Sequence, residues 1–344
     1  MQPDYKNEEK RQSTHYRALG FFMFFLLLFV AFISFGIGYY PLSATEIIRA
    51  FAFRFGYEGD VLPQAITIFW SIRFPRIIAA ILIGSSLSVA GVAYQGMFRN
   101  PLVSPDILGV SSGASLGAAI AIMQGSPNWL VQLAAFSGGI SAVSFSYLIS
   151  RKSAHSQTLS LVLTGAMITA LCNAGVTLLK YIASPTDLLP QITFWLMGSL
   201  AGVRINDIWL STAPMALGLI TLFILRWRIN LLTLDEDEAK SLGINIRRYR
   251  LIFIVASTLM SSAAICLGGL IGWVGLMVPH MGRSLAGPDY KRLIPACAML
   301  GAIYLLIMDG IARSVLALEL PLGVVVSVMG APFFVFLIIK RRES

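Results

Sequence analysis

The sequence predicts an all-α membrane protein of about ten transmembrane helices, with short or broken helices, an inverted repeat and both termini in the cytoplasm. Three observations carry this prediction. The 344 residues are 56% hydrophobic and only 12% charged, which is too apolar for a soluble domain. Apolar stretches of membrane-spanning length recur along the whole chain. The basic residues lie between those stretches and gather on one side of the predicted membrane.

The apolar stretches predict ten helices, at 19–40, 66–98, 107–124, 129–150, 158–183, 206–225, 249–272, 276–287, 293–312 and 322–339. The first is long enough to span, and no small-x-small cleavage site follows it, so an uncleaved helix is expected rather than a signal peptide. The stretch at 276–287 is too short to cross a hydrocarbon core of roughly 30 Å. A half-length helix is tolerated where it packs in protein or lines a cavity. We therefore expect a tail at 1–18, one polytopic membrane domain at 19–340 and an end at 341–344.

Charge predicts the orientation of these helices. Nineteen of the 26 Lys and Arg residues fall on the side that holds the tail, the even-to-odd connections and the C-terminus. The other seven are Arg49, Arg54, Arg73, Arg76, Lys180, Arg204 and Arg313. This positive-inside bias places both termini in the cytoplasm. The net charge of +9 is thus interpreted as an orientation signal in a lipid environment, and no nucleic-acid partner is expected.

Two segments suggest an inverted repeat. A long helix ending in "GMFRNPLVSPDILG" in the first half corresponds to one followed by "GLMVPHMGRSLAG" in the second. Each has a proline-bearing break and then a short Gly-rich helix, and the two breaks fall on opposite sides of the membrane. We expect Pro279 and His280 to end a helix. The motif residues are Asn100, Pro101, Gly109, Gly275, Pro279, His280 and Arg283.

No metal site is expected in this chain. His280 has no second ligand at metal spacing, so a hydrogen-bonding structural role is favoured over metal ligation. The three cysteines stand singly within apolar stretches and are assigned to packing.

The segment "TLDEDEAKSLGINIRRYR", within a cytoplasmic loop at about 229–248, predicts a short helix outside the membrane. Thr233 and Glu236 form a T-x-x-E capping box, and acidic residues crowd the first turn, where the helix dipole favours them. Gly243 can close the helix in a left-handed conformation. The helix is interpreted either as a solvated connector or as a docking helix for a cytoplasmic partner. Docking is favoured because the chain has no other large soluble part.

Charged residues at the outer ends of two helices form a second group. Arg73 and Arg76 in "SIRFPRIIAA" lie three residues apart and share a helix face. They either snorkel to the interface or form a basic patch for an acidic extracellular partner. Asp309 and Arg313 in "IMDGIARS" are spaced i, i+4. Asp309 is interpreted as one half of an internal ion pair, and the rival interpretation is a proton relay in a secondary transporter.

The sequence contains no catalytic signature. We find no G-x-x-x-x-G-K-[ST] phosphate loop, no H-E-x-x-H and no serine elbow. The protein is therefore not expected to be an enzyme, and no catalytic residue is assigned. If it moves a solute with ATP, another subunit must hydrolyse the ATP.

The chain resembles the FecCD-type permeases of ABC importers for iron chelates, haem and cobalamin, from about residue 65 onward. The resemblance rests on several stretches in the same order: "RFPRIIAAILIGSSLSVAGVAYQGMFRNPLVSPDILGVSSGASLG", "WLMGSLAG", "DEDEAKSLGINI", "GLIGWVGLMVPHMGR", "MDGIAR" and "ELPLGVVVSVMGAPFFVFLI". It implies ten helices per subunit, a homodimer, two ATPase subunits that hold ATP and Mg, and a periplasmic binding protein. It implies no cofactor in this chain and a location in the bacterial inner membrane.

The resemblance also implies residue roles. The ATPase-coupling residues are Asp235, Glu236, Glu238, Ala239, Leu242, Gly243 and Ile244, and the residues that dock the binding protein are Arg73, Arg76 and Arg313. The substrate stays open among ferric siderophore, haem, cobalamin and oxyanions such as molybdate or tungstate. A secondary transporter that uses Asp309 is the alternative class, and a channel is a weaker one.

Overall fold

The computed structural model describes residues 5–56, 59, 62–152, 157–233, 245–316 and 318–340, and the regular elements among these residues are helices, with no strand. In chain order the elements are α1 (Tyr5–Gly36), α2 (Ala44–Phe53), α3 (Pro63–Thr67), the π-helix η1 (Ile68–Arg73), α4 (Phe74–Phe98), the 3₁₀-helix η2 (Pro105–Leu108), α5 (Val110–Met123), α6 (Asn128–Ser150), α7 (Gln157–Ile182), α8 (Leu188–Met197), α9 (Ile205–Leu232), α11 (Ile246–Gly268), α12 (Val274–Ala286), α13 (Tyr290–Ser314) and α14 (Leu322–Lys340). Each of the ten predicted stretches coincides with helix.

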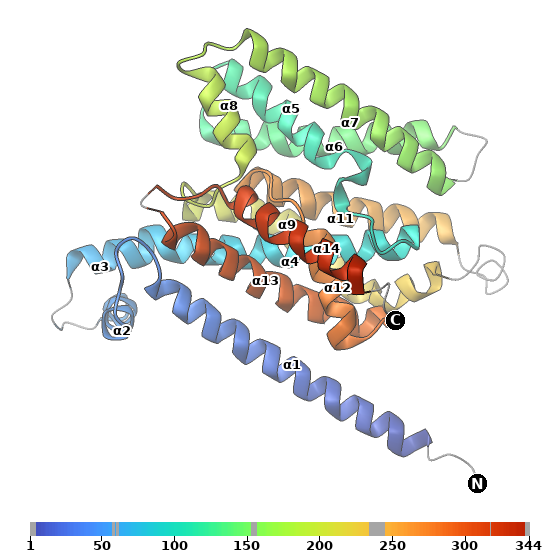
Figure 1. Cartoon of the computed structure of the whole chain (residues 1–344), viewed down its shortest axis with the longest axis horizontal. Helices are drawn as coiled ribbons and strands as arrows, with labels where there is room; N and C mark the ends of the chain where they lie inside the picture. The colour runs from blue at the N-terminus through green and yellow to red at the C-terminus, as the bar shows by residue number, and fades with distance from the viewer. Residues whose placement is uncertain are drawn as a thin grey trace.

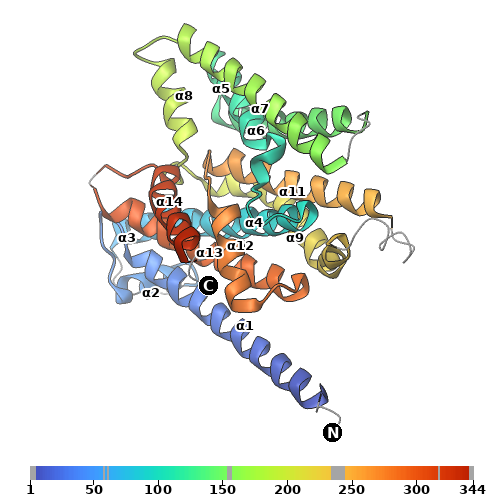
Figure 2. The same ribbon diagram turned by 45° about the vertical axis from the view of Figure 1, so that its right-hand side comes forward.

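Seven helical segments of the described chain are long and apolar enough to cross a membrane. The helices at α5, α12 and α14 are shorter or less apolar, so ten spans stays a prediction. The helices form two groups, with α5, α6, α7 and α8 in one and α4, α9, α11, α12, α13 and α14 in the other (Figures 1 and 2). α4 is the centre of the second group and packs against α9, α11, α12 and α13.

Glycines let these helices touch backbone to backbone. A Cβ on Gly84 of α4 would overlap the carbonyl oxygen of Gly301 of α13. A Cβ on Gly91, two turns further along α4, would overlap the carbonyl oxygen of Gly275 of α12. Small residues at such contacts allow close packing in lipid, where helix association depends on van der Waals contact. By contrast α1 exposes Phe21, a residue that is 67% accessible, as expected of a face turned to lipid.

The chain breaks where α4 and α11 end. After α4, Arg99 is left-handed (φ 51°), and Gly109 (φ 87°) leads from η2 into α5. After α11, the chain is irregular from Gly269 (φ 70°) to Trp273 (φ 66°), where α12 begins. The two breaks lie at opposite ends of the bundle (Figure 1), the placement that an inverted repeat predicts.

The prediction that Pro279 and His280 end a helix is wrong. Both lie inside α12, and the break precedes them. Pro279 has no backbone N–H to give to the carbonyl of Gly275, four residues earlier. That carbonyl instead faces Gly91 of α4, where a Cβ would overlap it. Close packing on α4 therefore accommodates the proline within the helix.

Two helices were not predicted. α2 begins with a capping box, in which the Glu46 backbone N–H donates to Ser43 Oγ at 3.3 Å and the Ser43 backbone N–H donates to Glu46 Oε2 at 2.7 Å. Hydrogen bonds from the Ser43 hydroxyl and then its backbone N–H hold the pKa of Glu46 below its ordinary value. The S-x-x-E pattern was available in the sequence. α8 is a ten-residue apolar helix that is too short to be recognised as a span.

The connection between α9 and α11 is shorter than the loop predicted at about 229–248. α9 continues to Leu232, and α11 begins at Ile246. Arg226 and Arg228 lie within α9, and their guanidinium groups stack on Phe223 (4.1 Å to the ring centroid) and Trp227 (3.8 Å). We call this end of the bundle the cytoplasmic end, following the charge bias, and the opposite end the outer end.

Candidate functional site

Arg73 ties the outer end of α4 to the chain after α1. It lies at the end of the π-helix η1, whose wider turn passes directly into α4. Its guanidinium donates hydrogen bonds to the carbonyl oxygens of Phe35 and Tyr40. The residue is only 4% exposed. Arg73 therefore acts as a clamp between α1, the following loop and α4.

Asp309 is the centre of a buried charge network beside this clamp. Arg76 Nε lies 2.8 Å from Asp309 Oδ1, and Arg313 Nε lies 3.0 Å from Asp309 Oδ2. Arg76 also bonds Glu319 at 2.7 Å through Nη1, and Arg313 donates to the carbonyl oxygen of Ile37 at 3.1 Å. Asp309 is fully buried, whereas the side chain of Glu319 is 40% exposed. With Arg73 the group carries three positive and two negative charges.

The structure confirms the predicted ion pair of Asp309 and Arg313. It corrects the exposure expected of the outer arginines, because Arg73, Arg76 and Arg313 are 4%, 3% and 5% exposed rather than forming an open patch. The carboxylates that neutralise Arg76 come from α13 and the connection after it, more than 230 residues away in the sequence. Docking of a binding protein by these arginines stays a prediction.

Three chain segments cross at the outer end through glycine contacts. Ser199 N–H donates to the carbonyl oxygen of Gly268 at 2.9 Å, and Leu322 N–H donates to that of Gly198 at 2.9 Å. Gly198 is left-handed (φ 70°), and a Cβ there would lie 2.5 Å from the carbonyl oxygen of Leu270. The end of α8, the break after α11 and the start of α14 are thus held as one unit.

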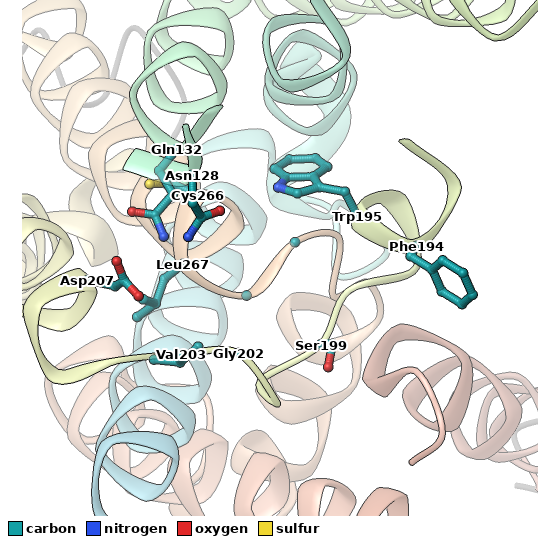
Figure 3. A pocket seen from close by; sticks show the side chains of 12 residues that line it. Asn128, Gln132, Phe194, Trp195, Ser199, Gly202, Val203, Asp207, Cys266 and Leu267 are labelled. Carbon is teal, nitrogen blue, oxygen red and sulfur yellow. The ribbon is translucent and has the colours of Figure 1, made fainter. Parts of the chain in front are cut away.

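A pocket of about 160 Å³, which we call the outer pocket, opens beside this crossing (Figure 3). It is lined by Asn128, Gln132, Phe194, Trp195, Ser199, Gly202, Val203, Asp207, Cys266, Leu267, Gly268 and Gly269. Gln132 is 5% exposed, and its Oε1 has no hydrogen-bond partner. No basic side chain is among the lining residues. The pocket can therefore accept hydrogen bonds from a ligand, but it offers an anion no cationic partner.

The remaining motif residues have structural positions. Asn100 Oδ1 accepts from Leu102 N–H at 2.9 Å in the turn that also contains Pro101, and Gly109 caps α5 in a left-handed conformation. His280 packs edge-to-face on Phe333 at 6.5 Å between centroids. Arg283 lies in the last turn of α12. None of them reaches the outer pocket.

The coupling residues Asp235, Glu236, Glu238, Ala239, Leu242, Gly243 and Ile244 lie outside the described residues. The chain on either side of them is well anchored. Asn230 Nδ2 donates to Asp289 Oδ1 at 2.7 Å, and Tyr290 N–H donates to Asn230 Oδ1 at 3.2 Å. Asn245 caps α11 by accepting from Arg248 N–H at 3.1 Å.

Sequence reasoning missed Glu319 and the pocket residues Asn128, Gln132 and Asp207. Glu319 occurs in the quoted motif "ELPLG", but nothing local to it indicates Arg76 as its partner. Asn128 and Gln132 lie at the start of α6, after a connection that carries no recognisable motif, and Asp207 lies in the first turn of α9, just after the quoted stretch "WLMGSLAG" but outside it.

The membrane-length helices, the helix breaks at opposite ends and the buried charge network define a multi-pass membrane transport protein. The FecCD transport family model matches residues 26–340, and the chain belongs to that family.

Similar proteins agree with this membership. The molybdate import system permease protein MolB of Haemophilus influenzae is 37% identical over 97% of this chain and 98% of its own length. The "Probable iron chelatin transport system permease protein" of Helicobacter pylori is 40% identical over 83% of this chain and 86% of its own. A solved structure of an inward-facing, metal-chelate type ABC transporter matches with a TM-score of 0.84 and 35% identity, over 94% of this chain and 99% of that one. The chain is therefore an ABC-type permease, and its relatives are named as permease subunits of transport systems.

Proposed function

We propose that this chain is the membrane subunit of an ATP-driven importer that takes up a metal chelate such as a ferric siderophore, haem or a cobalamin-like compound. Two copies form the pathway, two ATPase subunits bind below and hold ATP and Mg, and a binding protein delivers the substrate from outside. The observation that carries the proposal is the family match over 26–340 together with the 0.84 TM-score to a metal-chelate type transporter.

An oxyanion such as molybdate or tungstate is the second candidate substrate, because the Haemophilus relative matches almost the whole chain. The chelate is placed first because the solved structure that matches 94% of this chain is of the metal-chelate type, and a relative at 40% identity is named for an iron chelatin. The outer pocket offers either substrate hydrogen-bonding groups, Gln132 Oε1 among them, and none of its lining residues is Lys, Arg or His.

The substrate is tested with the complex reconstituted in proteoliposomes, together with its ATPase and its binding protein. We expect ATP-dependent uptake with a ferric siderophore, haem or cobalamin and none with molybdate. Uptake of molybdate and of none of the chelates would show that the substrate is an oxyanion. Uptake that is driven by a proton gradient without ATP would show that the protein is a secondary transporter and not part of an ATP-driven importer. That outcome is disfavoured by Asp309, because both of its carboxylate oxygens already face buried guanidinium groups.

The loop at 229–248 is proposed to seat on the ATPase. Replacing Gly243 by Pro should uncouple ATP hydrolysis from uptake, because proline cannot adopt the left-handed cap predicted there. We expect uptake to fall at least tenfold while membrane insertion and co-purification of the permease subunits persist. ATPase activity and uptake are measured in the same proteoliposomes. Gly56→Pro, which replaces a left-handed glycine (φ 91°) after α2 where a Cβ would meet nothing within 4 Å, is the matched control. Unchanged stimulated ATPase activity and uptake in Gly243→Pro would contradict the role.

The buried outer arginines imply a specific mode of docking. A carboxylate of the binding protein could reach Arg76 by displacing Glu319, which is 40% exposed and shares that guanidinium with Asp309. Glu319→Gln should therefore tighten docking several-fold at low salt and little at high salt. Affinity of the binding protein for the reconstituted permease measures this effect. Asp187→Asn, which removes an exposed outer carboxylate bonded to Gln191, is the control. If the wild type and Glu319→Gln bound the binding protein with equal affinity at low salt, Arg76 would not be part of the docking surface.

A further inference from the structure

We propose that the cytoplasmic ends of α9 and α13 form a binding site for the headgroup of one anionic phospholipid. An open hollow lies there, lined by Phe223, Ile224, Arg226, Trp227 and Lys291. The proposed transport function assigns no role to these residues. The site lies where a positive-inside membrane protein meets the headgroups of the cytoplasmic leaflet.

Contacts between the two helices build the hollow. Asp289 caps α13 and accepts a hydrogen bond from Asn230 Nδ2 of α9 at 2.7 Å, while Tyr290 N–H donates to Asn230 Oδ1 at 3.2 Å. Asn230 lies one helical turn after Arg226 on the same face of α9. This pairing fixes Lys291, in the first turn of α13, beside Arg226. Two cationic side chains from different helices thus border one hollow.

The aromatic side chains hold the cationic groups in place. The guanidinium of Arg226 lies 4.1 Å from the ring centroid of Phe223, and that of Arg228 lies 3.8 Å from the centroid of Trp227. Stacking limits the freedom of a long side chain and leaves the edge of its guanidinium fork to bind a phosphodiester. None of the five lining residues is acidic. The chemistry of the hollow therefore matches a negatively charged phosphate group.

An apolar track beside the hollow identifies the ligand as a lipid rather than free phosphate or an acidic protein. Leu217, Ile220 and Ile224 are 61%, 57% and 65% exposed. Their spacings of three and four residues place them on one face of α9 that leads from the hollow toward the middle of the membrane. Trp227, at the headgroup end of this face, is 46% exposed. An acyl chain can lie along the track while its phosphate contacts Arg226 and Lys291.

The test uses the full-length protein in nanodiscs of phosphatidylcholine with increasing phosphatidylglycerol. Native mass spectrometry of the released protein counts the retained lipids. We expect preferential retention of one phosphatidylglycerol, reduced in Arg226→Gln/Lys291→Gln by roughly fivefold for each charge removed. The preference should also weaken at high salt. Arg151→Gln/Lys152→Gln removes the same charge from the exposed end of α6, on the same side of the membrane, and should retain the preference.

The outcomes separate the site from its alternatives. Equal loss of preference in both double variants would show general surface electrostatics and overturn the site. Absence of any preference in the wild type would overturn it as well. Loss of ATPase co-purification in Arg226→Gln/Lys291→Gln with unchanged lipid retention would assign the hollow to an acidic face of the ATPase. Retention of free inorganic phosphate in place of lipid would assign it to a soluble anion.

Discussion

Replacing Asp309 by Asn is expected to lower the free energy of unfolding by about 3–5 kcal/mol, the usual cost of removing one member of a buried ion pair. Asn preserves the shape of the side chain, but it leaves Arg313 without its carboxylate partner and Arg76 with only the partly exposed Glu319; the two guanidinium groups lie 3.0 Å and 2.8 Å from the altered group. Thermal denaturation in detergent and the yield of monodisperse protein measure the loss. The same substitution should not make transport respond to a proton gradient.

Glu319→Gln is the matched control for Asp309→Asn. Both substitutions remove one carboxylate charge from Arg76, but Glu319 is 40% exposed, and solvent can replace much of its interaction. Its effect should stay within about 1 kcal/mol, the range of exposed ion pairs. Equal stability of the Asp309→Asn variant and the wild type would mean that the arginines do not depend on Asp309.

Replacing Gly91 by Val should disrupt the packing of α4 against α12. A Cβ at Gly91 would overlap the carbonyl oxygen of Gly275, and both sides of this contact are backbone. Rotamer changes cannot relieve such an overlap, so the helices must separate. Overpacking usually costs about 1–3 kcal/mol, and we expect a loss at or above the upper end of that range. Thermal denaturation and protease sensitivity of the purified protein measure it.

Gly20→Val in α1 controls for the change of residue type. Gly20 also lies within an apolar helix, but a Cβ there would meet nothing within 4 Å. Its stability should match the wild type within about 0.5 kcal/mol, as for substitutions away from packed features. If Gly91→Val were as stable as Gly20→Val, α4 and α12 could not be in backbone contact at this level.

The sequence by itself determined the class, the helix positions and the residues of the charged motifs. Hydropathy is a local property, and a bilayer demands long apolar runs, so all ten predicted stretches are helical. The i, i+4 spacing of Asp309 and Arg313 also fixed one ion pair, because residues one turn apart on a helix are neighbours. Short elements were harder to predict from the sequence, because a helix such as α8 has too few residues to be recognised as a span.

Only the tertiary structure decided which distant groups meet. Arg76 looked like an outward cation because its neutralising partners, Asp309 and Glu319, are more than 230 residues away. Pro279 looked like a helix end because its local effect is to remove a hydrogen bond, and the packing of Gly275 on Gly91 accommodates that loss. Local pattern determines which segments become helices, since backbone hydrogen bonds in a membrane must be satisfied within each segment. The burial of a charge and the tolerance of a proline depend on contacts between segments, and these form only when the helices pack.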